Sequence, residues 1–197
     1  MFSSRELQAV LPSLLLPSPN LASAPDASLA SVLVPIMIST AEPRVVFTKR
    51  TDTLSRHAGE ISFPGGLADE GEDAASAALR EAEEELGLSP RDVQLVGSLP
   101  PVHTRVTRIL IVPYVGLLER DPQFTPNTDE IAEILEFPLS HLVAHGAEGE
   151  FEHEGRSFRT YVYEVEGHVI WGATARILWS FVELLARGRG STGAVPA

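Results

Sequence analysis

The chain has 197 residues, of which 44% are hydrophobic and 21% charged, a composition that suits one globular domain with a sizeable core. Its formal net charge of −12 argues against a general nucleic-acid-binding protein, because such proteins need a basic face to displace phosphate counterions. The lack of cysteine excludes disulfides, thiolate metal sites and a cysteine nucleophile, and no apolar run approaches the length of a transmembrane helix.

The first quarter of the chain predicts a short helix followed by a β-hairpin. Residues 3–16 have helical character and end at a proline, and the Pro/Ser/Ala-rich stretch 17–30 reads as a loop. Two β-rich runs follow, 31–39 and 43–50, separated by the turn sequence TAEP. Residues 1–30 are therefore expected to form an N-terminal helix and loop that precede the main domain.

A helix is predicted over residues 73–87, and Gly87 followed by Pro90 ends it. Its small apolar residues recur at intervals of three and four, which defines one buried stripe: Ala75, Ala78, Leu79, Ala82 and Leu86. The alanines would let this helix lie close to a sheet. Elements expected after it are strands at 93–100 and 107–118, a strand and short helix around Pro138 within 130–143, a hairpin at 156–172 and a helix at 174–188.

Strands and helices mix along the chain without strict βαβ alternation. The expected fold class is therefore α+β, with a mixed β-sheet covered by helices. The main domain is expected to span residues 31–188, and residues 189–197 read as a disordered tail.

Three glutamates on the helix at 73–87 carry the most informative pattern. Glu81, Glu84 and Glu85 are spaced i, i+3 and i+4, so they share one helix face and repel one another unless a positive charge lies among them. Converging carboxylate oxygens suit a hard cation such as Mg²⁺ or Mn²⁺. A backbone carbonyl of Gly65 could add another oxygen. The alternative is a solvated acidic face with Arg80 as its counterion.

The spacing of the residues around these glutamates helps to decide between a cation site and a solvated acidic face. From Gly66 the chain reads Gly, five residues, Glu72, seven residues, Arg80-Glu81-Ala82, one residue, Glu84-Glu85, one residue, Gly87-Leu88. This pattern resembles the Nudix box, the signature of hydrolases that cleave nucleoside diphosphates linked to another moiety. Ala82 is smaller than the aliphatic residue usual there. The resemblance implies the Nudix α/β/α sandwich, with a mixed β-sheet between helices.

The same resemblance implies roles for the residues of the box. Glu81, Glu84 and Glu85 would be the main metal ligands, with Glu84 also counted among the catalytic residues. Arg80 would orient a glutamate, and Glu72 would support the loop–helix geometry or a second metal. The bound Mg²⁺ or Mn²⁺ would bridge the diphosphate and activate water.

An upstream stretch, residues 47–66, resembles the motif of the coenzyme A pyrophosphatase subgroup. The matching residues are Thr48, Arg50, Gly59, Phe63, Pro64, Gly65 and Gly66. Thr51 replaces the usual serine, and Ser55 stands where a second arginine is usual, with Arg56 directly after it. Segments 128–139 and 168–178 also resemble this subgroup. The resemblance implies hydrolysis of coenzyme A, or a derivative, to 3′,5′-ADP and 4′-phosphopantetheine.

A polyanionic substrate needs basic contacts, and four arginines near the box or on bordering strands are the candidates: Arg50, Arg56, Arg105 and Arg108. Several Nudix enzymes take a general base from a loop glutamate after the box, which here favours Glu130, with Glu133 as its rival. His57 and His103 are weaker candidates for proton transfer. Phe63 and Trp171 could line an apolar groove, although core packing is the favoured interpretation.

Other functions remain open at this point. One is a Nudix pyrophosphatase for ADP-ribose, NADH or another nucleotide conjugate. Another is a non-catalytic Nudix-fold nucleotide-binding domain, and a third is a structural protein whose acidic helix is only a solvated face. The expected partner is a small-molecule substrate rather than nucleic acid or membrane, with homo-oligomer formation left open. The absence of targeting signals and the location of the substrate favour the cytoplasm.

Overall fold

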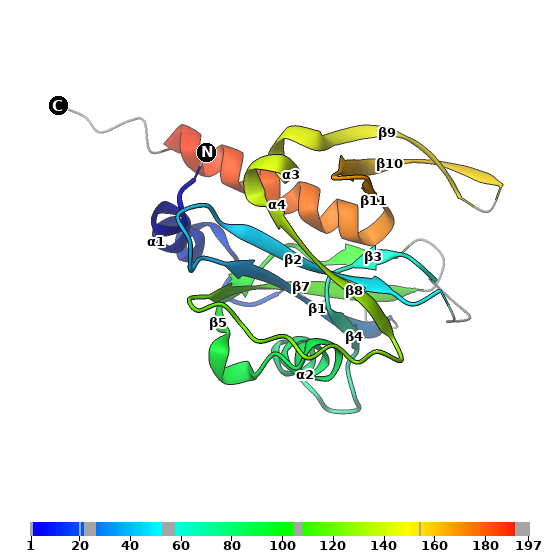
Figure 1. Cartoon of the computed structure of the whole chain (residues 1–197), viewed down its shortest axis with the longest axis horizontal. Helices are drawn as coiled ribbons and strands as arrows, with labels where there is room; N and C mark the ends of the chain where they lie inside the picture. Colours follow the sequence, from blue (N-terminus) through cyan, green and yellow to red (C-terminus); the bar gives the residue numbers. More distant parts are fainter. Residues whose placement is uncertain are drawn as a thin grey trace.

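The computed structural model describes residues 2–19, 21, 27–52, 58–104, 108–153 and 155–191. Within these ranges it contains two β-sheets and four α-helices (Figure 1). In chain order the elements are α1 Ser4–Leu14, β1 Ser28–Met37, β2 Arg44–Arg50, β3 Ile61–Ser62, β4 Gly65–Leu67, α2 Ala74–Leu86, a 3-10 turn Pro90–Asp92, β5 Gln94–Ser98, β6 Val102–His103, β7 Ile109–Leu118, β8 Ile131–Pro138, α3 Leu139–His145, β9 Gly146–His153, β10 Arg156–Val165, β11 His168–Ile170 and α4 Gly172–Ser191.

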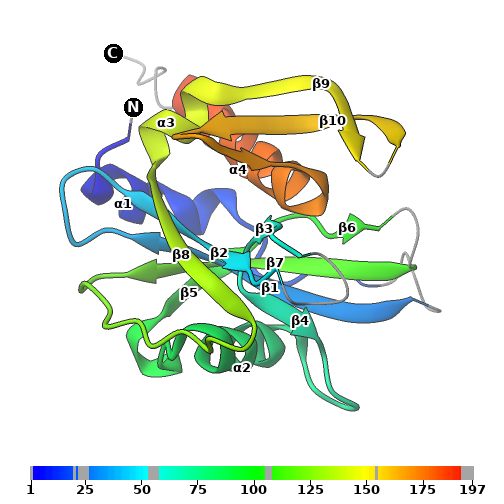
Figure 2. The same ribbon diagram turned by 45° about the vertical axis from the view of Figure 1, so that its right-hand side comes forward.

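The larger sheet has eight strands and is mixed. Strands β1 and β7 run parallel at its centre, and the other pairings within this sheet are antiparallel. Side chains alternate between its two faces. Val46 packs against α2, whereas its neighbours Val45 and Phe47 pack against α1 and α4 on the opposite face. Figure 2 shows the same layers, with α2 on one side of the sheet and α4 on the other. The expected α+β sandwich is confirmed.

The edge of β1 is divided between two partners. Near its C-terminal end β1 pairs with β2 through Ile36 and Val45, and near its start it pairs with β4 through Val32 and Gly65. The segment 61–67 thus enters between β1 and β2, pairing first with β2 and then with β1. A Cβ atom on Gly65 would lie 2.3 Å from the carbonyl oxygen of Ser31, so this close approach requires glycine.

Phe63 lies inside this segment and belongs to the core. It is 3% exposed, and its ring stacks on Phe47 with centroids 4.7 Å apart. The interpretation of Phe63 as a core residue is therefore confirmed. Its burial fixes the segment against the sheet on the side opposite α2.

Helix α2 begins and ends with recognisable caps. The Asp73 side chain accepts hydrogen bonds from the amides of Ala75 and Ser76, and Gly87 ends the helix in the left-handed conformation at φ 66°. The predicted buried stripe is only partly right, because Ala75 and Leu79 are half-exposed. The helix buries instead a broader alanine face: Ala74, Ala77, Ala78, Ala82 and Leu86. Small side chains on adjacent positions let the helix lie flat on the strands.

A second, three-stranded antiparallel sheet in the order β11-β10-β9 lies beyond α4 (Figure 1). Strand β9 was not predicted, because its sequence GAEGEFEH has low intrinsic β propensity and depends on pairing with β10. The short strands β3, β4 and β6 were not predicted either. No helix in the described part of the chain is both long and apolar enough to cross a membrane.

Two elements, α4 and β1, have different boundaries in the structure from those predicted. Helix α4 continues to Ser191, beyond the stop expected at Gly188. A Cβ atom on Gly188 would lie 2.7 Å from a side-chain carbon of Leu14, so this glycine serves the close contact between α4 and α1. Strand β1 begins at Ser28, ahead of the domain start expected at residue 31.

Helix α1 packs into the main core. Leu7 and Leu11 are completely buried, and Leu15 is nearly so. Immediately after the helix, Leu16 and Ser98 exchange backbone hydrogen bonds of 2.9 and 2.8 Å, which covers the edge of β5. The N-terminal segment is therefore continuous with the core of the domain.

Replacing Leu11 with alanine is expected to lower the free energy of unfolding by about 2–5 kcal/mol, because the cavity cannot collapse in a core that holds α1 against α4. Urea unfolding monitored by tryptophan fluorescence measures the change. Leu16→Ala is the control, since Leu16 is 40% exposed and its truncation should cost less than about 1 kcal/mol. An equally small loss for Leu11→Ala would mean that α1 unfolds independently of the domain.

Candidate active site

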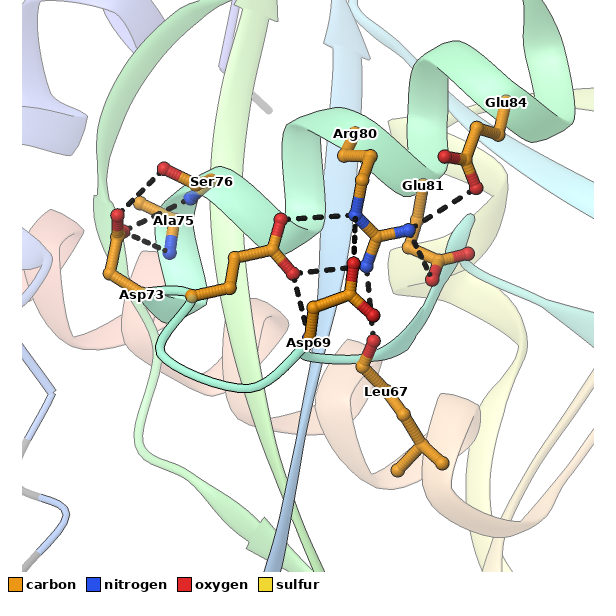
Figure 3. Close-up of polar contacts among 9 residues, drawn as sticks. Leu67, Asp69, Asp73, Ala75, Ser76, Arg80, Glu81 and Glu84 are labelled. Carbon is orange, nitrogen blue, oxygen red and sulfur yellow. Dashed lines mark hydrogen bonds and ion pairs between the residues drawn. The ribbon is translucent and has the colours of Figure 1, made fainter.

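Arg80 is the centre of a dense set of polar contacts on α2 (Figure 3). Its Nε and Nη2 atoms donate to the two carboxylate oxygens of Glu72, both at 3.0 Å. Its Nη1 donates to Glu81 Oε1 at 2.9 Å and to Glu84 Oε2 at 3.2 Å, and Nη2 also donates to the Leu67 carbonyl at 3.1 Å. The bond to Glu72 and the nearby Glu81 raise the pKa of Arg80, so its charge is permanent. Arg80 is one positive charge among the repelling glutamates.

Glu72 closes the loop that leads into α2. Besides the paired bonds from Arg80, its Oε2 accepts from the Asp69 amide at 2.9 Å. The Arg80 bond and the Asp69 amide hold the pKa of Glu72 below its usual value. The structure thus places Glu72 where the resemblance expected it, between loop and helix, and its contribution to catalysis stays a prediction.

Glu85 is a buried carboxylate at the inner side of the helix. Its side chain is 7% exposed, Oε2 accepts from the Gly65 amide at 3.3 Å, and Oε1 lies 3.8 Å from Nη1 of Arg50. Burial raises the pKa of Glu85 to about 7, against the opposing effect of the Gly65 amide, and the neighbouring Glu81 raises it further. The ionised form of Glu85 therefore gains strongly from a nearby cation.

Glu81 rests against the backbone of the preceding loop. A Cβ atom on Gly66 would lie 2.4 Å from Glu81 Oε1 and 2.7 Å from Oε2. Burial raises the pKa of Glu81, although the Arg80 bond opposes it. Gly66 is thus needed for space, because any side chain there would push the Glu81 carboxylate away.

The three glutamates differ in how far solvent reaches them. The side chain of Glu84 is 60% exposed, whereas the exposed fraction is 18% for Glu81 and 7% for Glu85. Strand β4 crosses this end of α2, and its glycines let the helix approach so closely that the two carboxylates are covered. Helical periodicity shows which residues share a face of α2, but it does not show which other segments of the chain cover that face.

The donor set fits a hard cation. Glu81 and Glu85 are two poorly solvated carboxylates that repel each other, and their oxygens are the ligands that Mg²⁺ and Mn²⁺ prefer. Among the described residues, no three acidic or histidine side chains are already gathered closely enough to hold an ion. Glu81, Glu84 and Glu85 would hold the ion, with the Gly65 carbonyl as a further candidate. The Gly65 amide points to Glu85, so the residue borders the site.

The loop before β8 brings Glu130 to this site. The Thr51 amide donates to the Glu130 carbonyl at 2.8 Å, and the Asn127 amide donates to the carbonyl of Glu85 at 2.9 Å. The first bond joins the loop to the end of β2, and the second joins it to the C-terminal end of α2. Glu130 Oε2 then lies 3.9 Å from Nη2 of Arg50, and its charge acts on both Glu81 and Glu85.

The rival base, Glu133, lies on the other face of the sheet. It pairs with Lys49 across the strands, with Nζ and Oε2 3.8 Å apart. Its neighbours of the same parity on β8, Leu135 and Phe137, pack toward α1 and α4 rather than toward α2. The structure therefore favours Glu130 over Glu133 as the loop carboxylate.

The other predicted contacts are more scattered. Arg56, Arg105 and His57 lie outside the described residues. Arg108 is exposed just before β7, with a positive φ of 53°. His103 is exposed on β6, and its carbonyl accepts from Arg176. Trp171 stacks on Phe151 with centroids 4.9 Å apart, in line with a packing role.

Sequence reasoning missed two contributions to the site. It gave Arg50 a substrate role without seeing that this side chain reaches both Glu85 and Glu130. It also missed the Leu67 carbonyl and the Asp69 amide, which complete the contacts of Arg80 and Glu72. Backbone groups carry no sequence signal, so only the turn-forming stretch between Gly66 and Glu72 pointed to them.

The raised pKa of Glu85 predicts a pH-dependent loss of stability in the metal-free protein. The group favours folding fully below its unfolded-state pKa of 4.5, and this contribution is lost as the pH rises to about 7, where the folded-state group ionises. The loss is up to roughly 3 kcal/mol. Denaturation in EDTA at pH 5 and pH 8 measures it, and Glu85→Gln should remove most of the difference. An unchanged pH dependence in that variant would contradict the assignment.

The protein family follows from the similarity of the chain to known proteins. The sequence matches the NUDIX domain over residues 29–160, so the chain belongs to the Nudix family, whose members generally use divalent cations to hydrolyse nucleotide diphosphate substrates. The chain is 38% identical over 152 residues to the uncharacterized Nudix hydrolase NudL of Pectobacterium atrosepticum, covering 76% of this chain and 78% of that one. NudL of Escherichia coli K12 is 36% identical with the same coverage. This chain is likewise a Nudix hydrolase.

A solved structure supports the fold alone. The Nudix hydrolase RenU of M. smegmatis is similar with a TM-score of 0.53 and 13% identity, covering 87% of this chain and 89% of that one. The sandwich predicted from the box is therefore the fold of known Nudix enzymes.

Proposed function

We propose that this protein is a Mg²⁺- or Mn²⁺-dependent diphosphatase that hydrolyses coenzyme A, or a derivative, to 3′,5′-ADP and 4′-phosphopantetheine. One observation carries the proposal. The segment Phe63-Pro64-Gly65-Gly66, which resembles the coenzyme A pyrophosphatase motif, forms the wall of the acidic site. Gly65 binds Glu85 and Gly66 makes room for Glu81, while Arg50 of the same motif reaches Glu85. The subgroup residues are thus part of the acidic site itself.

In this proposal each box residue has one task. Glu81, Glu85 and Glu84 hold the cation, which when bound polarises the diphosphate and lowers the pKa of water. Arg80 keeps Glu81 and Glu84 oriented, and Glu72 fixes both Arg80 and the loop amide. Their positions are set before substrate arrives, which lowers the reorganisation needed during the reaction.

Glu130 is the proposed general base. Its side chain is about half exposed and lies on the loop tied to the end of α2, so a carboxylate can reach a water molecule beside the substrate. It accepts the proton as the water oxygen attacks phosphorus and the bridging P–O bond breaks. The substrate phosphates are proposed to contact four arginines: Arg50, Arg56, Arg105 and Arg108. We propose that the enzyme acts in the cytoplasm.

A substrate panel tests the proposal. Coenzyme A, ADP-ribose and NADH are incubated with the protein and Mg²⁺ or Mn²⁺, and the products are separated and identified by mass. Formation of 3′,5′-ADP and phosphopantetheine, at a kcat/KM at least tenfold above the other two compounds, supports the proposal. Preference for ADP-ribose or NADH would overturn the subgroup assignment and leave the Nudix chemistry intact. No cleavage of any compound would favour a nucleotide-binding role.

A further inference from the structure

Arg80 and Arg50 make different kinds of contact with the carboxylates of the site. Arg80 makes hydrogen bonds of 2.9–3.2 Å to Glu72, Glu81 and Glu84. Arg50 lies between Glu85 and Glu130, and its two Nη atoms stay 3.8 and 3.9 Å from them, beyond hydrogen-bond distance. Arg80 is therefore held by hydrogen bonds, whereas the contacts of the Arg50 side chain with the described residues are longer-range charge contacts.

The backbone sets Arg50 at this position. The pairing of β2 with β8 shifts register between Lys49 and Arg50, and the Arg50 amide donates to the Glu60 carbonyl at 3.0 Å. Strand alternation places the pair Lys49–Glu133 on the face opposite α2 and sends Arg50 toward α2. The Arg50 side chain is 26% exposed, so it can also turn toward solvent without a backbone change.

A cation bound by Glu85 changes the charge around Arg50. With Glu85 and Glu130 ionised, one guanidinium leaves a net charge of −1 on this group of three side chains. A divalent ion held by Glu85, together with Glu81 and Glu84, would take over the charge of Glu85 and repel the guanidinium in a poorly solvated site. An arriving diphosphate supplies the negative charge that Arg50 would otherwise lack, and guanidinium groups bind phosphate oxygens in pairs.

We propose that Arg50 is an exchangeable counterion: it partly offsets the charge of Glu85 and Glu130 in the metal-free protein, and a bound cation would displace it from Glu85 onto the diphosphate. This inference rests on the proposed function of the site as a metal-dependent diphosphatase. It differs from a fixed substrate contact, because the contribution of Arg50 to diphosphate binding depends on the metal. Arg50 in this sense is a positioning residue before metal binding and a substrate contact after it.

The first experiment measures metal affinity without turnover. Mn²⁺ binding is followed by titration calorimetry at pH 8 for wild type, Arg50→Ala, Arg50→Lys and the control Lys49→Ala. Removing the competing charge should tighten Mn²⁺ binding about tenfold in Arg50→Ala. Arg50→Lys keeps the charge and should resemble wild type, as should Lys49→Ala, whose partner lies on the other face. Unchanged or weaker binding in Arg50→Ala would overturn the proposal, and Arg50→Gln replaces it if the alanine variant does not fold.

The second experiment uses α,β-methylene-ADP, a diphosphate that cannot be hydrolysed between its phosphorus atoms. In saturating Mg²⁺, Arg50→Ala should weaken its binding about tenfold, the loss typical of a charge-assisted contact. In EDTA, wild type and Arg50→Ala should bind it equally weakly. An equal loss with and without Mg²⁺ identifies a fixed anion contact and overturns the exchange. Neither experiment requires coenzyme A cleavage, so failure of the substrate assignment and failure of this inference are distinguishable.

Discussion

Replacing Glu85 with glutamine is expected to reduce kcat/KM for the preferred diphosphate substrate by about 10³-fold or more, because a metal-bound carboxylate contributes several kcal/mol to stabilising the transition state. Glu85 is the most buried of the three glutamates, and its charge has little solvent to stabilise it. The amide of glutamine keeps the shape and the bond from Gly65 but removes the charge that is proposed to hold the cation. Initial rates at saturating Mg²⁺, together with Mn²⁺ affinity, measure the effect.

Glu83→Gln is the matched control for this variant. Glu83 lies on the same helix two residues away, is exposed, and is not among the described partners of Arg80. Its activity should stay within about twofold of wild type. If Glu85→Gln retained more than a tenth of the wild-type rate, the buried carboxylate would not be a metal ligand.

Gly66→Ala is expected to lower kcat/KM by on the order of 10²-fold, because misplacing a ligand by about 1 Å is enough for such a loss. The new methyl group would lie 2.4 Å from the Glu81 carboxylate, which has to move. That carboxylate is the end of a flexible side chain, so the fold should survive the change. Activity and thermal unfolding measured together separate the two effects.

Gly149→Ala serves as the control for Gly66→Ala, since a Cβ atom there meets no other atom within 4 Å. It should leave kcat/KM and the melting temperature nearly unchanged. A Gly66→Ala protein with normal activity would show that Glu81 does not need its present position. A protein that does not fold would show that residue 66 is constrained by the sheet rather than by the site.

The sequence predicted the elements whose pattern is local. The spacing from Gly66 to Leu88 identified both the helix and the acidic residues on it, because cap, periodicity and ligand positions all lie within 23 residues. Strand β9 was missed because its glycines and glutamates form a strand only against β10. Gly188 was read as a helix stop because nothing local shows that Leu14 lies against it.

In the candidate site, too, the features that depend on distant segments of the chain could not be predicted from the sequence. Glu130 was favoured from sequence, but Glu133 stayed its rival, because only the structure shows that Glu133 lies on the face of β8 opposite α2. The burial of Glu85 likewise depends on β4, a strand of three residues that pairs with the start of β1. Arg50 was assigned to the site by its motif, and only the folded chain shows that it lies between two carboxylates.

The length of segment 61–67 also determines how Gly65 and Gly66 face the site. It leaves β2 at Ser62 and joins β1 at Gly65, so only two residues lie between the strands. Since side chains and amides alternate along a strand, one inserted residue would reverse the direction in which Gly65 and Gly66 face. The Gly65 amide would turn away from Glu85, and the space for Glu81 would close. The length of this linker is therefore as tightly constrained as its residue identities.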